Sequence, residues 1–297
     1  MEKKKILISG AGGFIGRNLR EGLAADYNII APTSKELDLL NTKQVKKFLE
    51  HGAFDAVIHC ATHNATANSQ KDTSLVLNNN LLMFFNLASC HELYSQMLYF
   101  GSGAEYGREF MPPKVMEDYF GSSMPTDDYG FSKYICNLAA QNSDNIYNLT
   151  LFGCFGKYED WEIRFISNAC AKAVNGMDIT IKQNVKFDYL YINDLVKIVR
   201  YFIKARKLKF KKYNVCSGHS IDLQSLAQIV LKVSEKNLNI KIAQRGLGRE
   251  YSGSNERLLR EFKYFKFTPM EKAIEELYKW YQDHRNKISR DLLLKDK

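Results

Sequence analysis

The chain has 297 residues, of which 45% are hydrophobic and 25% charged, so it can bury the core of one large or two modest globular domains. No apolar run approaches the roughly 20 residues that span a bilayer, and the N-terminus leads into a short strand instead of a cleavable signal peptide. We therefore expect a cytoplasmic protein with no membrane partner. Six scattered cysteines without CxxC pairs predict reduced, buried thiols, with neither a metal site nor a disulfide framework.

The formal net charge of +9 raises the question of nucleic-acid binding. The densest basic run, residues 204–212, lies at the end of a predicted helix and in the turn after it. Such a run is typical of a solvated surface. No nucleic-acid motif with interleaved aromatic residues accompanies it, so we expect no nucleic-acid partner. A positive field would still attract a small polyanionic substrate or cofactor.

Strands and helices alternate along the first half of the chain, which predicts a parallel sheet with helices on both faces. After a first strand from Lys5 and a helix to about residue 23, strands are predicted at residues 28–31, 55–60, 97–102 and 147–152 and helices at residues 42–50, 75–93 and 129–140. Prolines predict a loop at residues 107–128.

Beyond residue 152 the alternation becomes irregular. These shorter elements predict a smaller domain packed on the first. Helices are predicted at residues 162–175, 194–205 and 222–235 and from Pro269 onward, and strands at residues 179–181, 213–215 and 239–243.

The most informative motif is a run of glycines spaced GxxGxxG at Gly10, Gly13 and Gly16, between the first strand and the first helix. Gly10 permits a tight turn, Gly13 lets the backbone approach a pyrophosphate, and Gly16 lets the helix pack close to the strand. Phosphates are favoured at the helix N-terminus by free N–H groups and by the macrodipole. The alternative is a purely structural glycine turn. The strand before the motif and the helix after it favour a bound dinucleotide.

The residues after the second strand, 31–35, bear on the choice of dinucleotide. An NAD site usually places a carboxylate here for the ribose 2′-hydroxyl, whereas basic or hydroxyl side chains accept a 2′-phosphate. Ser34 and Lys35 occupy this place, and the nearest acid, Glu36, lies beyond it. The sequence therefore favours NADP. NAD, or a polar surface loop without ligand contact, stays open.

Tyr129 and Lys133 form a YxxxK pair on one face of a predicted helix. An ammonium beside a phenol favours the phenolate, so Tyr129 is a candidate to exchange a proton with a substrate carbonyl or hydroxyl. Ser102 stands at the end of the fourth strand, where ligands gather in open parallel sheets, and could orient the reacting oxygen. The alternative role for Ser102 is to cap a turn.

With these residues the chain resembles the extended short-chain dehydrogenases/reductases of the NAD-dependent epimerase/dehydratase family, which act on nucleotide sugars. The resemblance covers nearly the whole chain. It rests on the GxxGFIG turn, on the strand at residues 55–61, on Asn80, on Ser102 with Tyr129 and Lys133, and on the segments FDYLYIND at residues 187–194 and YNVCSG at residues 213–218.

The resemblance implies a Rossmann-like α/β fold, a doubly wound parallel sheet with a smaller C-terminal α/β domain that binds the substrate. It implies a cofactor domain at residues 1–160, to which residues 187–215 return, and a substrate domain at residues 161–186 and 216–297. The substrate would be a nucleotide diphosphate sugar, and a homodimer through the helices at residues 75–93 and 128–141 is common in relatives. The implied cofactor residues are Gly10, Gly13, Phe14, Ile15, Gly16, Ser34, Lys35, Asp38, Leu39, Ala61, Asn80, Tyr129 and Lys133.

Residues 34–41 resemble the branch of GDP-fucose synthase and dTDP-4-dehydrorhamnose reductase, whose members reduce 4-keto sugars with NADPH. In that branch Asp38 and Leu39 would bracket the adenine and Ala61 would pass under the cofactor. GDP-fucose synthase adds a cysteine two residues after the serine and a histidine for epimerisation. Ala104 replaces the cysteine, and residues 159–165 hold no histidine. We therefore expect a plain 4-ketoreductase that makes a deoxysugar building block for surface polysaccharide.

The same residues bear on other activities of this family. Dehydratases follow the serine or threonine with Asp-Glu, whereas Gly103 and Ala104 stand here and Glu105 lies one place too far. An NAD-dependent 4-epimerase uses the same Ser-Tyr-Lys set and stays open. A non-catalytic NADP-sensing protein would not need the three groups.

Substrate contacts are expected from the C-terminal domain. Each of the candidates could equally be a surface residue. They are Asn168, Lys172, Asn184 and Arg249. The chain also departs from the family at Phe187, which replaces an arginine, and at Gly153 and Lys157, which replace an asparagine and a proline.

Overall fold

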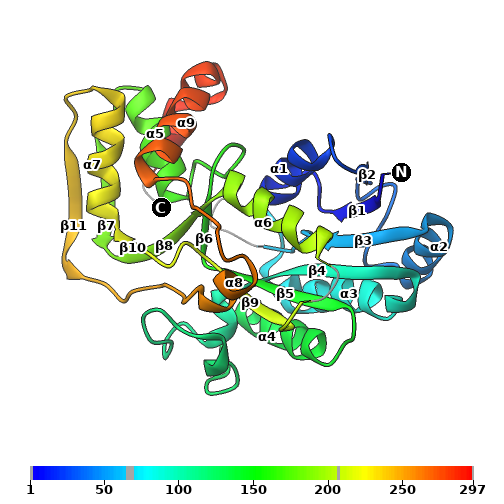
Figure 1. Cartoon of the computed structure of the whole chain (residues 1–297). Coiled ribbons are helices and arrows are strands. Elements are labelled where there is room, and N and C mark those ends of the chain that lie inside the picture. The colour runs from blue at the N-terminus through cyan, green and yellow to red at the C-terminus, as the bar shows by residue number, and fades with distance from the viewer. Residues whose placement is uncertain (1–2, 65–69, 206–207, 296–297) are drawn as a thin grey trace.

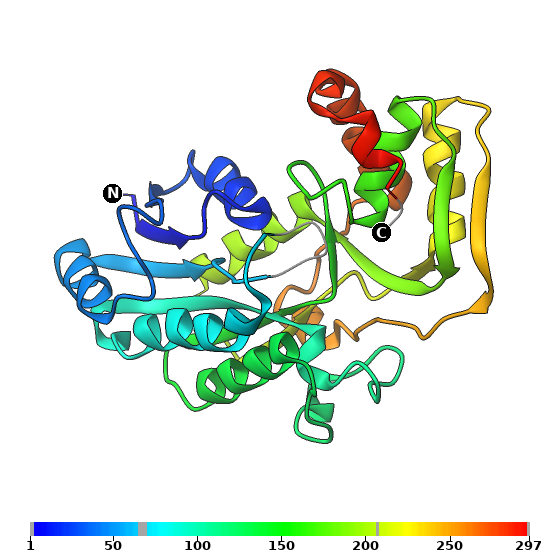
Figure 2. The same cartoon turned by 180° about the vertical axis from the view of Figure 1, so that it is seen from behind.

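A computed structural model describes residues 3–64, 70–205 and 208–295 (Figures 1 and 2). Six parallel strands form a central sheet in the order β2-β1-β3-β4-β5-β9. None of the helices in the described ranges is long and apolar enough to cross a membrane. The strands are β1 (Lys5–Ser9), β2 (Asn28–Ile30), β3 (Phe54–His59), β4 (Tyr94–Ser102), β5 (Ile146–Leu151) and β9 (Lys212–Val215).

Helices cover both faces of this sheet (Figure 1). Because successive side chains of a strand point to opposite faces, Ile6 and Ile8 of β1 join one apolar core with helices α1 (Phe14–Leu23) and α6 (Ile192–Lys204). Leu7 joins a second core on the other face. The doubly wound parallel sheet predicted from the alternation is therefore confirmed. The helices of the second face are α2 (Thr42–Gly52), α3 (Val76–Ala88) and α4 (Asp128–Gln141).

A second group of elements lies at the carboxyl-end side of the sheet (Figure 2). It contains a three-stranded sheet, β10-β8-β6, and a two-stranded sheet, β11-β7. Its strands are β6 (Gly153–Phe155), β7 (Ile179–Asn184), β8 (Lys186–Tyr191), β10 (Ser220–Asp222) and β11 (Ile240–Leu247). Its helices are α5 (Phe165–Val174), α7 (Leu223–Ser234), α8 (Glu256–Glu261), α9 (Met270–Asp283) and α10 (Arg290–Leu293).

Five short 3-10 helices complete the described elements, and two of them change the sequence-based picture. The predicted helix at residues 75–93 is shorter, because α3 ends at Ala88 and a 3-10 helix covers His91–Leu93. The predicted loop at residues 107–128 contains another at Glu117–Tyr119. The others are Thr73–Leu75, Gly103–Tyr106 and Arg285–Lys287.

Strands β6, β8 and β10 were not predicted. β6 and β10 have three residues each, too few to show a periodicity, and all three strands pair with partners distant in sequence. β9 pairs with β5 in the central sheet, whereas β8 pairs with β6 and β10. The bounds of the two domains stay a prediction.

The basic run at residues 204–212 is only partly a solvated surface. Lys204 and Lys209 are exposed as predicted, and Arg206 and Lys207 lie outside the described residues. The prediction is wrong for Lys212, whose side chain is 2% exposed. The aromatic rings of Tyr106 and Phe120 lie 4.0 and 3.9 Å from its ammonium and shield it from water.

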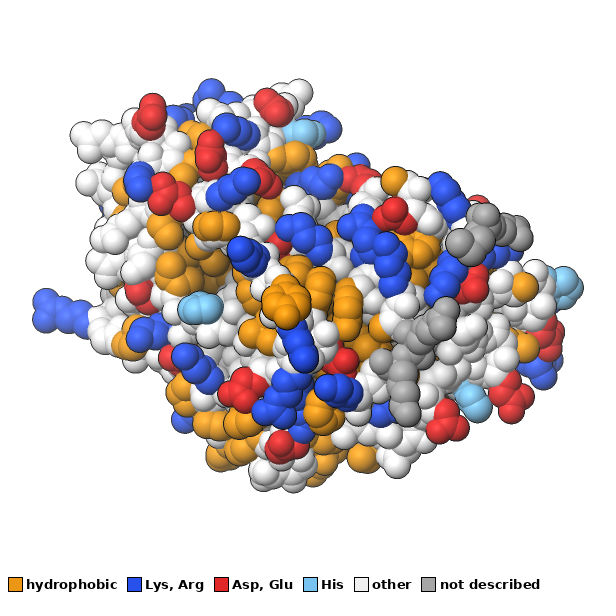
Figure 3. All heavy atoms as spheres, viewed as in Figure 1, with side chains coloured by type: hydrophobic (Ala, Val, Ile, Leu, Met, Phe, Trp, Pro, Cys, Tyr) orange, Lys and Arg blue, Asp and Glu red, His pale blue; other side chains and the backbone are white. Residues whose placement is uncertain are grey.

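Charged side chains of both signs are scattered over the face that Figure 3 shows, with apolar side chains between them. No single basic patch dominates this view. The six cysteines all lie in the described ranges and are free thiols, and Cys136, Cys170 and Cys216 are buried.

Candidate active site

The glycine turn has the backbone geometry that its spacing predicts. Gly10 has φ +68°, and a Cβ at this position would lie 2.6 Å from the amide nitrogen of Ala61. A Cβ on Gly16 would clash with the carbonyl oxygen of Gly10. Gly10 is therefore required by the turn and by the loop after β3, and Gly16 by the packing of α1 on the turn. A Cβ on Gly13 would meet only the Gly10 oxygen, at 3.4 Å, so Gly13 leaves its outer side free.

The N-terminus of α1 fits a pyrophosphate. Gly13 is the N-cap, and among the described residues no side chain caps this helix end. The first turn, which includes Phe14 and Ile15, carries no acidic residue. The free N–H groups and the positive end of the helix dipole are thus available to phosphate oxygens.

In the loop after β2, the exposed carboxylate of Glu36 is bonded within its own turn. Glu36 accepts hydrogen bonds from the amide and hydroxyl of Thr33, at 2.7 and 2.9 Å. These bonds, the backbone one first, lower the pKa of the Glu36 carboxyl. Ser34 and Lys35 are exposed at the tip of the same turn. The loop therefore offers a hydroxyl and a cation, while its nearest carboxylate is already occupied.

The two residues expected around an adenine are held differently. The Asp38 carboxylate accepts a hydrogen bond from the Leu40 amide at 3.0 Å, and Asp38 itself is exposed. Leu39 is buried in the core beneath α2 and α3. Only Asp38 therefore presents its side chain to solvent here.

Asn80 connects the loop after β3 to α4. Its side-chain oxygen accepts from the His63 amide at 2.7 Å, and its amide donates to the His63 carbonyl at 3.2 Å and to the Ser132 hydroxyl at 3.5 Å. Asn80 is buried. These contacts make it a residue that positions the loop following Ala61 against α4.

Ser102, Tyr129 and Lys133 are gathered at the carboxyl end of β4. Ser102 is the last residue of β4 and 8% exposed, and its Oγ accepts from the Ala104 amide at 3.2 Å. Asp127 caps α4 and places Tyr129, which is half-buried, in its first turn. Lys133 follows one helical turn later, and its Nζ lies 5.7 Å from the Tyr129 ring centroid.

Lys133 is anchored to the strand that carries Ser102. It is 5% exposed, and its ammonium donates to the carbonyl of Phe100 at 2.9 Å. Burial, and next the charge of Lys133, lower the pKa of His59 to about 3, so this imidazole is neutral. His59 in turn is hydrogen-bonded to Ser9 at 2.7 Å. Lys133 therefore lies beside the strand ends that flank the glycine turn.

Tyr251 reaches this site from the C-terminal part of the chain and was missed in the sequence. A Cβ on Gly103 would lie 2.6 Å from the Tyr251 hydroxyl. Burial raises the pKa of Tyr251 to about 12, and the charge of Arg108 and a hydrogen bond with Ser102 oppose that rise.

The backbone of Tyr251 is fixed by β8. Its amide donates to the Lys186 carbonyl at 2.9 Å, and its carbonyl accepts from the Asp188 amide at 3.0 Å. This pairing joins residues more than 60 positions apart in sequence. The only local signal was a lone aromatic in a stretch of Gly and Ser.

The candidate substrate residues are mostly occupied by their own framework. Asn168 donates to the Trp161 carbonyl at 2.9 Å, the buried Lys172 donates to the Thr180 hydroxyl, and Asn184 donates to Asp222 at 3.1 Å. Arg249 is exposed, two residues from Tyr251. The structure therefore brings Arg249 toward the segment that reaches Ser102, and turns the other three toward the second group of elements.

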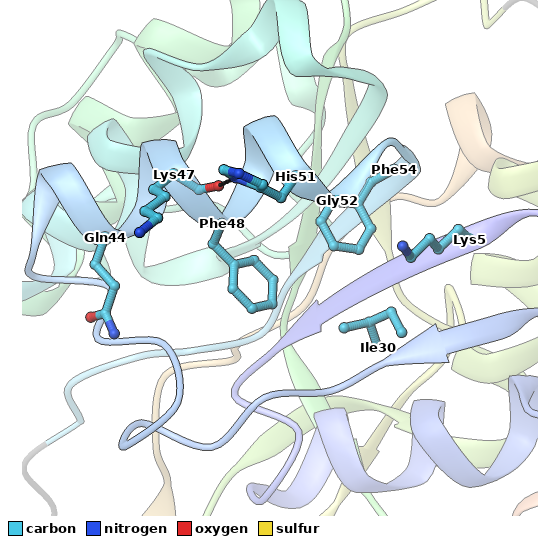
Figure 4. Close-up of a pocket in the computed structure, with 8 residues that line it drawn as sticks. All are labelled: Lys5, Ile30, Gln44, Lys47, Phe48, His51, Gly52 and Phe54. Atoms are coloured by element: carbon cyan, nitrogen blue, oxygen red, sulfur yellow. Dashed lines mark hydrogen bonds between the residues drawn. The ribbon is translucent and has the colours of Figure 1, made fainter.

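Two surface cavities lie elsewhere, and Ser102, Tyr129 and Lys133 line neither. One, of about 380 Å³, lies between α2 and the strands β1 to β3, and Phe48 points into it beside Phe54 (Figure 4). Lys5 and Phe54 are the first residues of β1 and β3, whereas Ser102 is the last residue of β4. This cavity therefore lies at the opposite end of the parallel strands from Ser102. The other, of about 540 Å³, lies between β8, β10 and residues 267–273.

Comparison with known proteins agrees with the family resemblance found in the sequence. The model of the NAD dependent epimerase/dehydratase family matches residues 6–216. GDP-L-colitose synthase of Yersinia pseudotuberculosis is 22% identical, over 95% of this chain and 99% of its own length. UDP-arabinose 4-epimerase 1 of Arabidopsis thaliana is 24% identical, over 95% of this chain and 80% of its own length.

Among solved structures, the GDP-mannoheptose C4 reductase of Campylobacter jejuni with NADP bound superposes with a TM-score of 0.82. The match covers 94% of this chain and 98% of that one at 18% identity. A likeness at this identity concerns the fold, which agrees with the Rossmann-like sheet described above.

Proposed function

Because the chain belongs to the NAD dependent epimerase/dehydratase family, we propose that it reduces a nucleotide-linked 4-keto sugar with NADPH. The observation that carries this proposal is the convergence of Ser102, Tyr129 and Lys133 at the end of β4, beside a glycine turn shaped for a pyrophosphate. The names of relatives that act on GDP- and UDP-linked sugars support a nucleotide sugar as substrate. The product would be a deoxysugar or related building block for surface polysaccharide.

The chemistry that NADPH supplies when bound is a hydride to the carbonyl carbon C4. Tyr129 donates the phenolic proton to the C4 oxygen, which becomes a hydroxyl. Ser102 donates a hydrogen bond that orients the same oxygen. Lys133 holds the nicotinamide ribose and supplies positive charge beside Tyr129 as the phenol loses its proton. Ala104, where epimerising relatives would need a cysteine, supports reduction without inversion at the neighbouring carbons.

The preference for NADP rests on Ser34 and Lys35, which are exposed while Glu36 is bonded to Thr33. A 2′-phosphate would meet a hydroxyl and a cation there, whereas residues 31–35 hold no carboxylate of the kind that binds the 2′-hydroxyl in an NAD site. The Campylobacter jejuni reductase that binds NADP supports the same choice.

The test measures the fall in absorbance as NADPH or NADH is oxidised in the presence of each of a panel of nucleotide-linked 4-keto sugars. Stoichiometric oxidation with one sugar, faster with NADPH, is expected. The alternative, a 4-epimerase, draws on the shared Ser-Tyr-Lys set and on the likeness to UDP-arabinose 4-epimerase 1. Interconversion of nucleotide hexoses with tightly retained NAD and no net oxidation would establish that alternative. Binding of NADP without turnover of any sugar would indicate a sensor.

A homodimer through α3 and α4 is part of the proposal. Phe84 and Leu87 of α3 are buried, whereas Leu82, Phe85 and Leu138 are 47%, 42% and 45% exposed. Apolar side chains on the outer side of two neighbouring helices favour a second copy of the chain. Phe85→Glu is expected to shift the chain from dimer to monomer in sedimentation, and an unchanged sedimentation coefficient would remove this part of the proposal.

A further inference from the structure

The strands β5 and β9 carry polar side chains where a buried sheet is normally apolar. Asn148 and Thr150 of β5 and Asn214 of β9 are completely buried, and Lys212 of β9 is 2% exposed. The paired registers Asn148↔Lys212 and Thr150↔Asn214 place them side by side. A polar cluster therefore lies beneath the 3-10 helix η3 (Gly103–Tyr106), which follows Ser102 directly.

Glu105 is the centre of this cluster. Its carboxylate is completely buried and accepts from the Thr150 hydroxyl at 2.7 Å, from the side chain of Asn137 at 3.0 Å and from that of Asn148 at 3.1 Å. It also accepts a hydrogen bond from the Ser102 amide at 3.4 Å and forms an ion pair with the Lys212 ammonium at 3.2 Å. Five separate elements, β4, η3, α4, β5 and β9, thus meet at one side chain.

These partners belong to the elements that carry the catalytic groups. The bond from the Ser102 amide forms a capping box with the bond that the Ser102 hydroxyl accepts, and this fixes the turn of the serine. Asn137 lies one helical turn after Lys133 on α4, the helix of Tyr129. Glu105 therefore connects the backbone of Ser102 to the helix that holds the other two groups.

The free energy of folding alone does not favour the buried ion pair between Glu105 and Lys212. Two buried charges lose their hydration, and apolar side chains of similar volume often stabilise a core equally well. Burial lowers the pKa of Lys212 to about 8, and the neighbouring Glu105 opposes that shift. A charged pair held where apolar side chains would serve is a feature that specifies geometry.

We propose that Glu105 is a positioning residue, which fixes the Ser102 turn against α4 so that the Ser102 and Tyr129 hydroxyls address the same substrate oxygen. This role rests on the proposed function, because it assigns Ser102 to the reaction. Glu105 itself lies on the inner side of the turn and touches neither substrate nor cofactor.

The test begins with Glu105→Gln, which keeps the shape and removes the charge. A small misplacement of a reacting group costs about 10- to 100-fold in rate, so kcat is expected to fall by about that factor while the Kd of NADPH stays unchanged. Thr150→Val removes one bond without removing a charge and keeps the test available if Glu105→Gln does not fold; a smaller loss of kcat is expected. The matched control is Glu92→Gln, at an exposed glutamate just before the opposite end of β4, which leaves kcat unchanged.

A double-mutant cycle separates positioning from general stability. If Glu105 acts through Ser102, Glu105→Gln lowers kcat in the wild-type background and has less than about a twofold effect in the Ser102→Ala background. Equal factors in both backgrounds would overturn the proposal.

Hydrogen exchange gives a readout that needs no substrate. Peptides that cover residues 101–107 are expected to exchange faster in Glu105→Gln, while those that cover residues 9–16 do not change. Unchanged exchange at residues 101–107 would overturn the positioning role even if the enzyme reduces 4-keto sugars. Faster exchange in Glu105→Gln, together with a wild-type chain that reduces no 4-keto sugar, would leave the structural link intact and refute the proposed function instead.

Discussion

The carboxyl ends of β1, β3 and β4 and the second group of elements use polar side chains in different ways. At the strand ends, Ser102, Tyr129 and Lys133 converge, and bonds such as that from Lys133 to the Phe100 carbonyl hold them in place. In the second group, Asn168 and Lys172 bond to neighbouring framework atoms. In the first region the polar side chains of the candidate site are gathered at one place. In the second region the candidate substrate residues Asn168 and Lys172 are bonded to the protein's own framework. We therefore expect the reaction and the cofactor to depend on the first region and the choice of substrate to depend on the second.

The largest expected effect comes from the first region. Tyr129→Phe removes the hydroxyl that donates the proton, and loss of a general acid typically costs about 100- to 10,000-fold in rate. We expect kcat to fall within that range with folding unchanged. Tyr134→Phe is the matched control, because Tyr134 is half-buried on the same helix and stacks on Phe120. Wild-type turnover in Tyr129→Phe would refute the assignment of the chemistry to this region.

The two regions also differ in how buried titratable groups affect stability. In the first, the pKa of His59 is lowered from 6.5 to about 3 by burial and then by Lys133. In the second, burial raises the pKa of Glu159 from 4.5 to about 8 against a hydrogen bond from Ser167. Between pH 3 and 6.5 the unfolded state binds a proton that native His59 does not, so stability is lost as the pH falls. Between pH 4.5 and 8 native Glu159 holds a proton that the unfolded state releases, so stability is lost as the pH rises.

The measurement is the melting temperature of two variants against pH. Glu159→Gln is expected to stabilise the protein by about 2–4 kcal/mol near pH 8 and by much less near pH 5. His59→Asn is expected to weaken the loss of stability on acidification to about pH 5, where protonation of the unfolded chain is worth about 2 kcal/mol. Parallel melting curves for wild type and Glu159→Gln from pH 5 to pH 8 would contradict a buried neutral carboxyl in the second region.

The glycine turn gives an intermediate effect. Gly16→Ala places a methyl group against the Gly10 carbonyl oxygen, and strain of this kind costs about 1–3 kcal/mol. If the strain displaces the turn, the Kd of NADPH rises by about 5- to 150-fold. Gly12→Ala is the control, because a Cβ there meets no atom within 4 Å. Equal cofactor affinity in the two variants would show that close packing of α1 does not shape the cofactor site.

The same division explains what the sequence could predict. The glycine spacing, the Tyr129–Lys133 spacing and the alternation of strands and helices are local patterns, so the glycine turn, the central sheet and the place of the candidate site followed from them. The catalytic roles stay a prediction. The role of Lys212 did not, because its partner Glu105 is more than 100 residues away and a basic run normally lies in water. Strands β6 and β10 were missed for a related reason, since three residues carry no periodicity and only the distant partner defines them.

Tyr251 is the point where the two regions meet, and it gives the smallest expected effect. Its backbone pairs with β8 in the second region, while its hydroxyl lies beside Gly103 and Ser102 in the first. Removal of one hydrogen bond typically costs about 0.5–1.5 kcal/mol, so Tyr251→Phe is expected to lower kcat by roughly 2- to 10-fold. Tyr264→Phe, at a side chain that is 92% exposed, is the control. If Tyr251→Phe instead raised KM for the sugar and left kcat unchanged, Tyr251 would contribute to substrate binding and not to the reaction. The boundary between the two regions would then pass between Tyr251 and Ser102.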